Sequence, residues 1–421
     1  MRHSTLRRTA VGTLLIAPLA AGLTACGGGG DGDPLAAAPY DATSQVSYAG
    51  AGSKKGDPNK PLEVTVKGDG HRITDVTATD AAGRFVRGKL SADGTRWRST
   101  SALAAGEHYT VRVSTEDHKG RPGRRVIGFD AAAADKLLRV TFGPDSGTYG
   151  VGQPITAELS APVRGHAARA RVERNLHVGS APQAAEGAWY WVDSRTLHYR
   201  PRVFWPTHAR IDVRSTLGGV QVKDALYGGP AKPLTLHTGD RVEAVTNAGS
   251  HYMTFIRNGR TIRTIPVTTG KLGFSTRNGI KVVLGQESFV RMNSTTVGIA
   301  AGSRDAYDLP VRWATRVTWS GEYVHAAPWS VGSQGRANVS HGCTGMSMSN
   351  AKWFFDQVRR GDLVRVINSR GSTMPPFGNG FGDWNLSWDA WKRGSASGTH
   401  READIPVATP NATPARLRPE A

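Results

Sequence analysis

Apolar and polar residues alternate along many short segments of this chain, whereas long helical patterns are rare. Leu62 to Val66 and Tyr109 to Val113 alternate with a period of two, and turn residues such as Asp93-Gly94 separate runs of this kind. A period of two places one face of a strand on a core and the other face in water. The pattern predicts a mainly β protein containing small antiparallel sandwiches of about 100 residues each.

Part of this pattern recurs at an offset of 100 residues, which indicates two related modules. Six residues in the first copy, Trp97, Leu103, Gly106, Tyr109, Val111 and Val113, correspond to Leu197, Val203, Pro206, Ala209, Ile211 and Val213. We place the modules at residues 46–135 and 136–238. Neither contains a cysteine pair or a group of catalytic residue types, so both are expected to act as spacers.

From Arg241 the pattern predicts a denser β-domain, which we place at residues 241–368. Strands at 252–256 and 261–267 flank Asn258-Gly259, a pair that tolerates positive φ and suits a tight hairpin. Further strands are expected at 281–284, 311–319, 321–324 and 363–367.

One helix is expected in this domain. Ser349 can cap its start, Trp353, Phe354 and Val358 form an apolar stripe, and Gly361 can end it.

The N-terminus has the pattern of an export signal. Three arginines precede an apolar stretch that is short and contains Pro18, so it is poorly suited to span a membrane. Leu23-Thr24-Ala25-Cys26 resembles the lipobox of bacterial lipoproteins, which implies a signal peptide at 1–25 and a lipidated Cys26. An ordinary cleaved signal with a free Cys26, or a spanning anchor, is the alternative. Lipid anchoring would hold the protein on the extracytoplasmic face of the cell membrane, with access to the cell wall.

Two segments are poor in apolar residues. We expect 26–45 to be a flexible tether and 394–421 a disordered tail. Between the third domain and the tail, Trp384, Trp388 and Trp391 recur with a spacing that predicts one helical stripe. Stacking of wall glycans on these rings is an alternative role for them.

The chain has a formal net charge of +19. It contains no basic helix, zinc-finger spacing or aromatic RNA-binding pattern, so nucleic acid is not an expected partner. For an exported protein the expected partners of this charge are anionic wall polymers and lipid headgroups. A solvated basic surface without a partner is the alternative.

The strongest chemical signal is Ser340-His341-Gly342-Cys343. A cysteine attacks as the thiolate, so it needs a nearby base or a positive environment. His341 lies two residues before the thiol, and His325 lies upstream at the end of an expected strand. Gly342 allows backbone N–H groups to approach a developing oxyanion.

Two other chemistries fit these residue types less well. His325, His341 and Cys343 could bind zinc, but no further metal-type cluster lies nearby in the sequence. Papain-like proteases have the cysteine near the mature N-terminus and the histidine downstream, which is the reverse of the order found here.

These residues resemble the signature of the L,D-transpeptidases, which cross-link peptidoglycan with a cysteine nucleophile. The likeness to the mycobacterial type includes two further segments, Gly321-Glu322-Tyr323-Val324-His325-Ala326-Ala327-Pro328-Trp329-Ser330-Val331-Gly332 and Ser349-Asn350-Ala351-Lys352-Trp353-Phe354-Phe355. The resemblance implies two immunoglobulin-like β-sandwich modules, then a catalytic β-sandwich with a short helix. It also implies a small C-terminal subdomain at 369–393 that packs on the catalytic domain.

The resemblance also implies roles for individual residues. Cys343 would be the nucleophile and His325 the base, oriented by the carbonyl of Ala326. The backbone N–H groups of His341, Gly342 and Cys343 would form the oxyanion hole, and Ser340 and the His341 ring would support the loop. The positions that would line the substrate channel are Met292, Tyr307, Ser320, Gly321, Trp329 and Gly345. Core packing of Met292 and Trp329, and a surface position for Tyr307 and Ser320, are the alternatives.

Two positions depart from the family pattern. Ala326 follows the histidine where many relatives have a small polar residue; a backbone carbonyl can still orient the ring. Gly345 stands where the family usually has Asn, so it cannot offer a side-chain amide to the donor peptide.

The implied reaction transfers the third residue of a tetrapeptide stem from its terminal D-alanine to Cys343, and then to the side-chain amine of a second stem. It needs no metal or cofactor, because the thioester retains the energy of the cleaved bond. Peptidoglycan stems would be the substrates, and β-lactams such as carbapenems the inhibitors. An L,D-carboxypeptidase at the same site and a non-catalytic wall-binding lipoprotein are the alternatives.

Overall fold

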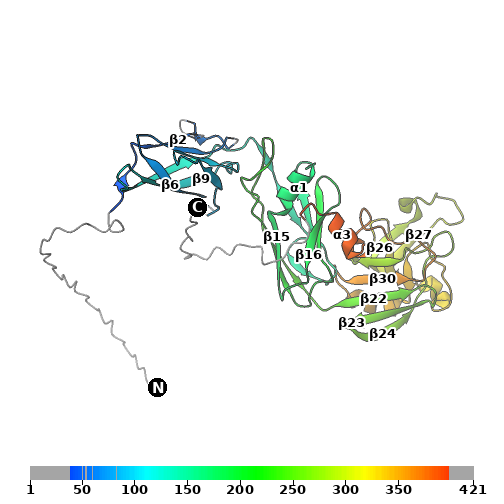
Figure 1. Ribbon diagram of the computed structural model, residues 1–421. Coiled ribbons are helices and arrows are strands. Elements are labelled where there is room, and N and C mark those ends of the chain that lie inside the picture. The colour runs from blue at the N-terminus through cyan, green and yellow to red at the C-terminus, as the bar shows by residue number, and fades with distance from the viewer. Residues whose placement is uncertain (1–37, 50, 53–54, 59, 82, 398–421) are drawn as a thin grey trace, which may run out of the picture.

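Three β-rich units follow one another in space in the order of the sequence (Figure 1). The computed structural model describes residues 38–397, except 50, 53, 54, 59 and 82. The predicted signal peptide, Cys26 and most of the predicted tether lie outside the described residues. None of the helices within that range is both long and apolar enough to cross a membrane. The mainly β fold class is confirmed.

The first module is a sandwich of two four-stranded sheets. One sheet has the order β1 (Tyr40–Asp41), β10 (Pro122–Asp130), β9 (His108–Glu116) and β6 (Arg72–Asp80). The other has the order β2 (Val46–Ala49), β5 (Glu63–Val66), β8 (Arg96–Ser99) and β7 (Gly88–Leu90). A separate pair joins β3 (Ala51–Gly52) to β4 (Lys55–Gly56). Alternate residues of β9 are buried in the core, as the period of two predicts.

The second module repeats this arrangement with an added helix. Its sheets are β12 (Val140–Gly143), β14 (Ile155–Leu159), β17 (Thr196–Pro201) and β16 (Gly187–Trp191), and β13 (Gly147–Tyr149), β21 (Leu234–Thr238), β18 (Arg210–Ser215) and β15 (Leu176–Ala181). A small third sheet contains β11 (Lys136–Leu138), β20 (Leu226–Gly228) and β19 (Gln221–Lys223). The helix is α1 (His166–Glu173).

The sequence repeat at an offset of 100 residues corresponds to equivalent strands. Tyr109, Val111 and Val113 are buried in or beside β9, and their counterparts at 209, 211 and 213 are buried in or beside β18. The correspondence fails at one pair, because Leu103 is buried whereas Val203 is 59% exposed.

The third unit packs a five-stranded sheet and a four-stranded sheet around a helix. The first sheet has the order β24 (Arg260–Pro266), β23 (Tyr252–Arg257), β22 (Val242–Asn247), β30 (Leu363–Ile367) and β25 (Gly279–Val282). The second has β26 (Gly285–Asn293), β27 (Asp308–Arg316), β28 (Tyr323–Ala326) and β29 (Thr344–Met346). Short 3-10 turns η1 (Ser294–Val297) and η2 (Pro328–Ser333) and helix α2 (Met348–Gln357) complete it.

The hairpin prediction is confirmed and the helix prediction needs a small correction. Asn258 and Gly259 have φ of 49° and 80° between β23 and β24. Helix α2 is capped by Ser347, whose hydroxyl accepts the Asn350 N–H, rather than by Ser349. The helix ends before Val358, because that residue is already extended, so Gly361 does not terminate it.

The prediction of a single tryptophan-bearing helix is wrong. Trp384 lies in the 3-10 turn η3 (Asp383–Asn385), whereas Trp388 and Trp391 lie in α3 (Trp388–Arg393), because Ser387 starts a new helix by capping Ala390. The segment also packs largely on the second module rather than only on the third unit. The Trp391 indole donates to Ala188 O at 2.9 Å, and the Trp384 indole to Gly152 O at 2.8 Å.

Each of the two segments predicted to be flexible includes described residues with defined contacts. Tyr40 and Asp41 form β1, paired in parallel with β10, so the tether cannot extend to residue 45. At the other end, the N–H groups of Ala396 and Ser397 donate to the Glu173 carboxylate at 2.7 and 2.9 Å. The described chain is therefore fixed on the second module through residue 397, beyond the predicted start of the tail.

Candidate active site

Cys343 lies in the short loop directly before β29, and Ser340 shapes that loop. The Ser340 hydroxyl donates to Cys343 O at 2.7 Å and accepts the Gly342 N–H at 3.1 Å. Gly342 has φ of 125°, a conformation that a side chain would strain. The half-buried Cys343 thiol donates to Gly321 O at 3.4 Å. The loop therefore holds the sulfur against the start of the segment that leads to β28.

His325 lies beside this loop because β28 and β29 are parallel neighbours. Their register places His325 opposite Gly345, two residues after the cysteine. The His325 Nδ1 lies 2.7 Å from Ala326 O, which can only accept, so Nδ1 carries the proton and Nε2 has a free lone pair in the neutral ring. Burial lowers the pKa of His325, which favours this neutral form.

The Cys343 thiol is also neutral at rest. Burial raises its pKa to about 12; a backbone hydrogen bond from Tyr323 and the Lys281 charge oppose this effect, and the Glu322 charge adds to it. A thiol with such a pKa must lose its proton during attack. The neutral His325 is suited to accept that proton, so the site contains an uncharged thiol and an uncharged base.

His341 does not act as a second base in this geometry, because side chains from other segments hold its ring in place. The ring lies 4.8 Å from the Phe274 ring and 5.1 Å from the Tyr307 ring, centroid to centroid. Its Nε2 lies 3.4 Å from the Asp305 carboxylate, which also binds Lys271 at 2.5 Å. His341 thus joins the cysteine loop to the segment between β26 and β27.

A pocket of about 240 Å³ opens above the cysteine. Eight of the predicted residues line it: Met292, Tyr307, His325, Trp329, Ser340, His341, Cys343 and Gly345. Trp329 is 54% exposed, which excludes core packing as its role. Gly321 contributes through the carbonyl that accepts the thiol, and Gly342 through the loop conformation.

Ser320 is not among the described residues that line this pocket. Its N–H donates to Asn379, and its hydroxyl lies 3.3 Å from the Arg277 guanidinium. These contacts hold Ser320 within the loop before β28, and its contact with the substrate stays a prediction.

Six further residues line the pocket and were not predicted: Thr268, Leu309, Val311, Ala327, Ser330 and Val339. Ala327 and Ser330 fall inside the segment after His325, so the motif itself could have indicated them. Thr268 has no such signal, because a long-range pair of hydrogen bonds with Gly345, each 2.9 Å, brings it to the site.

Gly345 occupies a position where a side chain has little room. A Cβ built there would lie 2.9 Å from the Ala327 Cβ and 3.1 Å from the Thr268 Cγ2. The glycine therefore lets the floor of the pocket close tightly beside the cysteine.

The zinc alternative lacks support from the geometry. Within residues 38–397, as far as they are described, no group of three or more His, Cys, Asp or Glu side chains is placed to hold a metal ion. His341 is paired with Asp305, and His325 with a carbonyl. The arrangement is suited to nucleophilic acyl transfer by a cysteine with a histidine base.

Comparison with known proteins gives two family matches. The L,D-transpeptidase catalytic domain matches residues 241–366, and a bacterial Ig domain matches residues 53–221. L,D-transpeptidase 2 of Mycobacterium tuberculosis is 35% identical over 336 residues, which make up 80% of this chain and 81% of that protein. L,D-transpeptidase 1 of the same species is 40% identical over 218 residues, or 52% of this chain and 80% of that protein.

The comparison also includes solved structures. The structure of L,D-transpeptidase LdtMt1 in complex with imipenem is 36% identical, with a TM-score of 0.48, and the match covers 55% of this chain and all of that one.

Proposed function

This chain belongs to the L,D-transpeptidase family, and from that premise we propose that Cys343 is its nucleophile and His325 its general base. The protein is an enzyme that acts as a peptidoglycan L,D-transpeptidase. One observation supports the assignment above the others: Cys343, in the loop before β29, and His325, on the adjacent strand β28, line the same pocket.

In the first step the Cys343 thiol loses its proton to His325 Nε2 as the sulfur attacks the carbonyl carbon of the third stem residue. The bond to the terminal D-alanine breaks, and its amine leaves with the proton that His325 returns. A thioester joins Cys343 to the shortened donor stem. The electron pair of the carbonyl rests on an oxyanion during this step.

Backbone N–H groups of the cysteine loop are suited to stabilise that oxyanion. The Gly342 N–H already donates to the Ser340 hydroxyl, so it is not available in this conformation. The N–H groups of His341 and Cys343 have no acceptor among the described residues. We therefore assign the oxyanion contacts to these two groups, and to Gly342 the role of shaping the loop.

In the second step the side-chain amine of another stem attacks the thioester carbonyl. His325 takes a proton from this amine, the C–S bond breaks, and the thiol is restored when the proton returns to sulfur. The product is a cross-link between the third residues of two stems. If water attacks instead, the product is a free tripeptide stem and the enzyme acts as an L,D-carboxypeptidase.

The test uses purified enzyme, a tetrapeptide muropeptide and a carbapenem. A β-lactam carbonyl is an acyl donor of the same kind, so we expect a single adduct on the Cys343 peptide and cross-linked dimers with free D-alanine. Cys343→Ala should abolish both products. Absence of the adduct from folded enzyme contradicts the assignment, and tripeptide without dimers identifies the carboxypeptidase.

We also propose that Cys26 is lipidated and holds the enzyme at the outer face of the cell membrane. The support is the sequence Leu23-Thr24-Ala25-Cys26 after an apolar stretch. Two or more acyl chains suffice for stable anchoring, and the net charge of +19 favours anionic wall polymers nearby. Cys26→Ala should move the protein from the membrane fraction to the soluble fraction; an unchanged distribution contradicts the proposal.

A further inference from the structure

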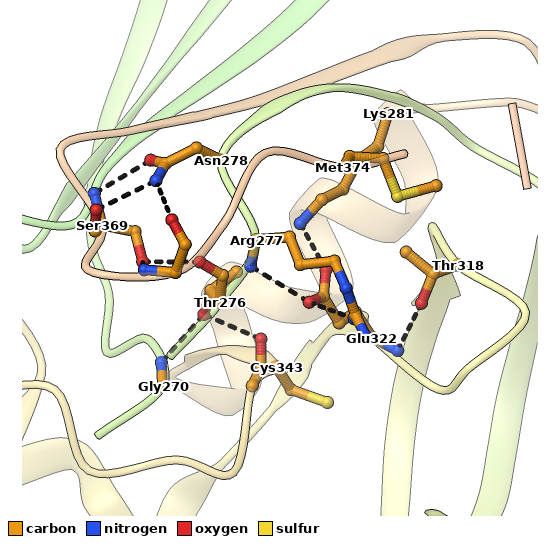
Figure 2. A network of polar contacts seen from close by, with 12 residues as sticks. Gly270, Thr276, Arg277, Asn278, Lys281, Thr318, Glu322, Cys343, Ser369 and Met374 are labelled. Atoms are coloured by element: carbon orange, nitrogen blue, oxygen red, sulfur yellow. Dashed lines mark hydrogen bonds and ion pairs between the residues drawn. The ribbon is translucent and has the colours of Figure 1, made fainter. Parts of the chain in front are cut away.

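A buried ion pair lies behind the cysteine loop and takes no part in the reaction described above. Lys281, on β25, is 1% exposed, and its Nζ binds the Glu322 carboxylate, whose side chain is 8% exposed (Figure 2). Neither residue lines the substrate pocket. A charged pair that is removed from water costs free energy unless its geometry and further hydrogen bonds are favourable. The cost of burying this pair next to the nucleophile suggests that it has a function there.

Glu322 contacts the nucleophile's surroundings in two ways. It follows Gly321, whose carbonyl accepts the Cys343 thiol. Its Cγ would lie 3.9 Å from a Cβ built on Gly342, so the side chain passes directly behind the cysteine loop. The Glu322 N–H donates to the Thr318 hydroxyl at 2.8 Å, which fixes the backbone at this point.

The segment that carries Lys281 is fastened to the same loop. The Thr276 hydroxyl donates to Gly342 O at 2.8 Å and accepts the Gly270 N–H at 2.9 Å. Two residues later, Asn278 binds Ser369 and Gly371 on the segment after β30, as Figure 2 shows in part. Residues 276–281 thus form a rigid wall behind Cys343.

The charges in this wall do not balance without the nucleophile. The Glu322 carboxylate accepts hydrogen bonds from the Arg277 N–H at 3.1 Å, from the Arg277 guanidinium at 3.0 Å and from Lys281. Two cations therefore share one carboxylate. The other ionisable side chains around Cys343 are His325, Tyr307, Tyr323 and His341, which is paired with Asp305. Burial raises the pKa of both tyrosines, which favours their uncharged forms. A thiolate at Cys343 would supply the missing negative charge.

We propose that Lys281 and Glu322 are positioning residues for catalysis: Glu322 holds the Lys281 charge behind the cysteine loop, where that charge offsets the repulsion between the carboxylate and the thiolate formed during attack. This inference rests on the proposed role of Cys343 as nucleophile. Burial lowers the pKa of Lys281, and the Glu322 carboxylate opposes this shift, so the ion pair favours the charged form of Lys281. The effect acts through the electrostatic field, and neither residue touches the substrate.

The proposal makes opposite predictions for the two residues. Lys281→Met leaves the Glu322 carboxylate near the sulfur, so thiolate formation should require a higher pH. Glu322→Gln keeps the shape and removes the carboxylate, whose effect on the Cys343 pKa is larger than the opposing effect of Lys281, so thiolate should form at a lower pH even where Lys281 loses its proton. A change of one unit in the pKa of the Cys343 thiol changes the thiolate fraction about ten-fold at a fixed pH below that pKa. A purely structural role would slow both variants or neither.

The experiment measures the rate of iodoacetamide alkylation at the Cys343 peptide by mass spectrometry between pH 7 and 10. It uses the full chain, and Lys352→Met serves as the matched control, because that lysine belongs to an exposed pair with Asp356 on α2. We expect the pH dependence of the alkylation rate to move to higher pH in Lys281→Met and to lower pH in Glu322→Gln. Lys281→Met/Glu322→Gln should lie between the two, and the control should match the wild type.

The outcomes separate this inference from the proposed function. Equal rates in wild type and folded Glu322→Gln overturn the inference while carbapenem acylation still supports the nucleophile. If Lys281→Met does not fold, the sign of the Glu322→Gln displacement alone decides, because a displacement toward higher pH also contradicts the proposal. Displaced alkylation without any carbapenem adduct supports the electrostatic role and contradicts the transpeptidase assignment.

Discussion

At the scale of single residues, the nucleophile and the base of the site are both uncharged before the reaction. Burial raises the pKa of Cys343 to about 12 and lowers the pKa of His325. An ion pair between them at rest would face the same desolvation that causes both shifts. The proton therefore moves only when the attacked carbonyl provides a place for the negative charge, and a neutral thiol is protected from oxidation between turnovers.

The His325 assignment predicts the acid limb of the pH profile. Because its pKa is lowered from 6.5, His325 stays neutral until the pH falls below that value, and activity is lost only as the pH falls through the lowered pKa. The rate of carbapenem acylation should therefore be flat near neutral pH and decline with a midpoint below 6.5. His325→Gln should lower the rate about 10²- to 10⁴-fold and remove this limb. A midpoint at or above 6.5 would contradict the burial argument.

Gly345 gives a prediction about packing at the pocket floor. Gly345→Ala places a methyl group 2.9 Å from the Ala327 Cβ, so the neighbours must move. Overpacking of this kind costs about 1–3 kcal/mol, which thermal unfolding should detect as a lower Tm. Ala327→Gly in the same chain should restore much of the loss. If Gly345→Ala alone leaves the Tm unchanged, the floor is more adaptable than the structure indicates.

Much of the residue-level site could be predicted from the sequence, because Cys343, His325 and the Ala326 carbonyl are near one another in a recognisable pattern. The buried partners could not. A lysine in a strand with alternating apolar residues is normally exposed, and only the tertiary fold brings Lys281 to Glu322. The contacts of Ser320 with Asn379 and Arg277 could not be predicted either, because they come from distant segments.

At the scale of elements, the long hairpin of β26 and β27 and its connecting segment line one side of the pocket. Its connecting segment, residues 294–307, includes η1 and contributes Tyr307 to the lining, while Met292 and Leu309 lie on the two strands beside it. Asp305 in this segment binds Lys271 and approaches His341 from across the pocket. Asp305, Lys271 and His341 thus join the connecting segment of the hairpin to the cysteine loop.

Removal of that fastening should loosen the hairpin end. Asp305→Asn removes the charge that binds Lys271, so hydrogen exchange of residues 298–307 should rise about two- to five-fold, since partly exposed ion pairs are individually weak. Peptide-resolved exchange mass spectrometry measures this change. Asp308→Asn is the matched control, because it removes the Arg291 pair within the hairpin and leaves the floor contact intact. Equal exchange in both variants would argue against the fastening role.

Short sequence patterns predicted an element correctly where neighbouring residues alone determine its conformation. The Asn258-Gly259 turn has the positive φ at both residues that a two-residue hairpin needs. The start of α2 was misassigned by two residues because Ser347 and Ser349 both suit a cap, and only the geometry selects Ser347. The tryptophan spacing was misleading because Ser387 begins a new helix between Trp384 and Trp388.

At the scale of the whole molecule, the hydrophobic core of the second module extends into the catalytic domain. Val282 and Leu363 of the catalytic domain belong to the same buried cluster as Trp189 of the second module. The Gly150 N–H donates to Arg360 O at 2.8 Å, and the Gly152 N–H to Gly361 O at 2.9 Å. The active site is thus carried on a rigid two-part body. Sequence patterns cannot reveal this interface, because it depends on glycines that allow two backbones to meet.

The C-terminal segment completes this body by returning to the second module. Buried His198 binds Asp383 at 2.7 Å, and Arg200 lies over the rings of Trp384, Trp388 and Trp391. The first module is joined differently, through the Arg84 guanidinium, which donates to Thr216 O and Gly218 O at 3.2 and 2.9 Å. The polar character of this joint makes the first module the part better suited to change its orientation.

The shared core predicts that one glycine couples the two parts. A Cβ at Gly150 would lie 2.2 Å from the Asp362 carboxylate and 2.3 Å from its backbone nitrogen, so Gly150→Ala must separate the two backbones. We expect calorimetry to show a lower Tm and a single transition that splits into two, as the second module and the catalytic domain unfold independently. Gly147→Ala, at the start of β13, is the control from the same segment, since its nearest contact is an ordinary 3.4 Å. If Gly150→Ala retains one transition at the wild-type Tm, the interface does not couple the folding of the two parts.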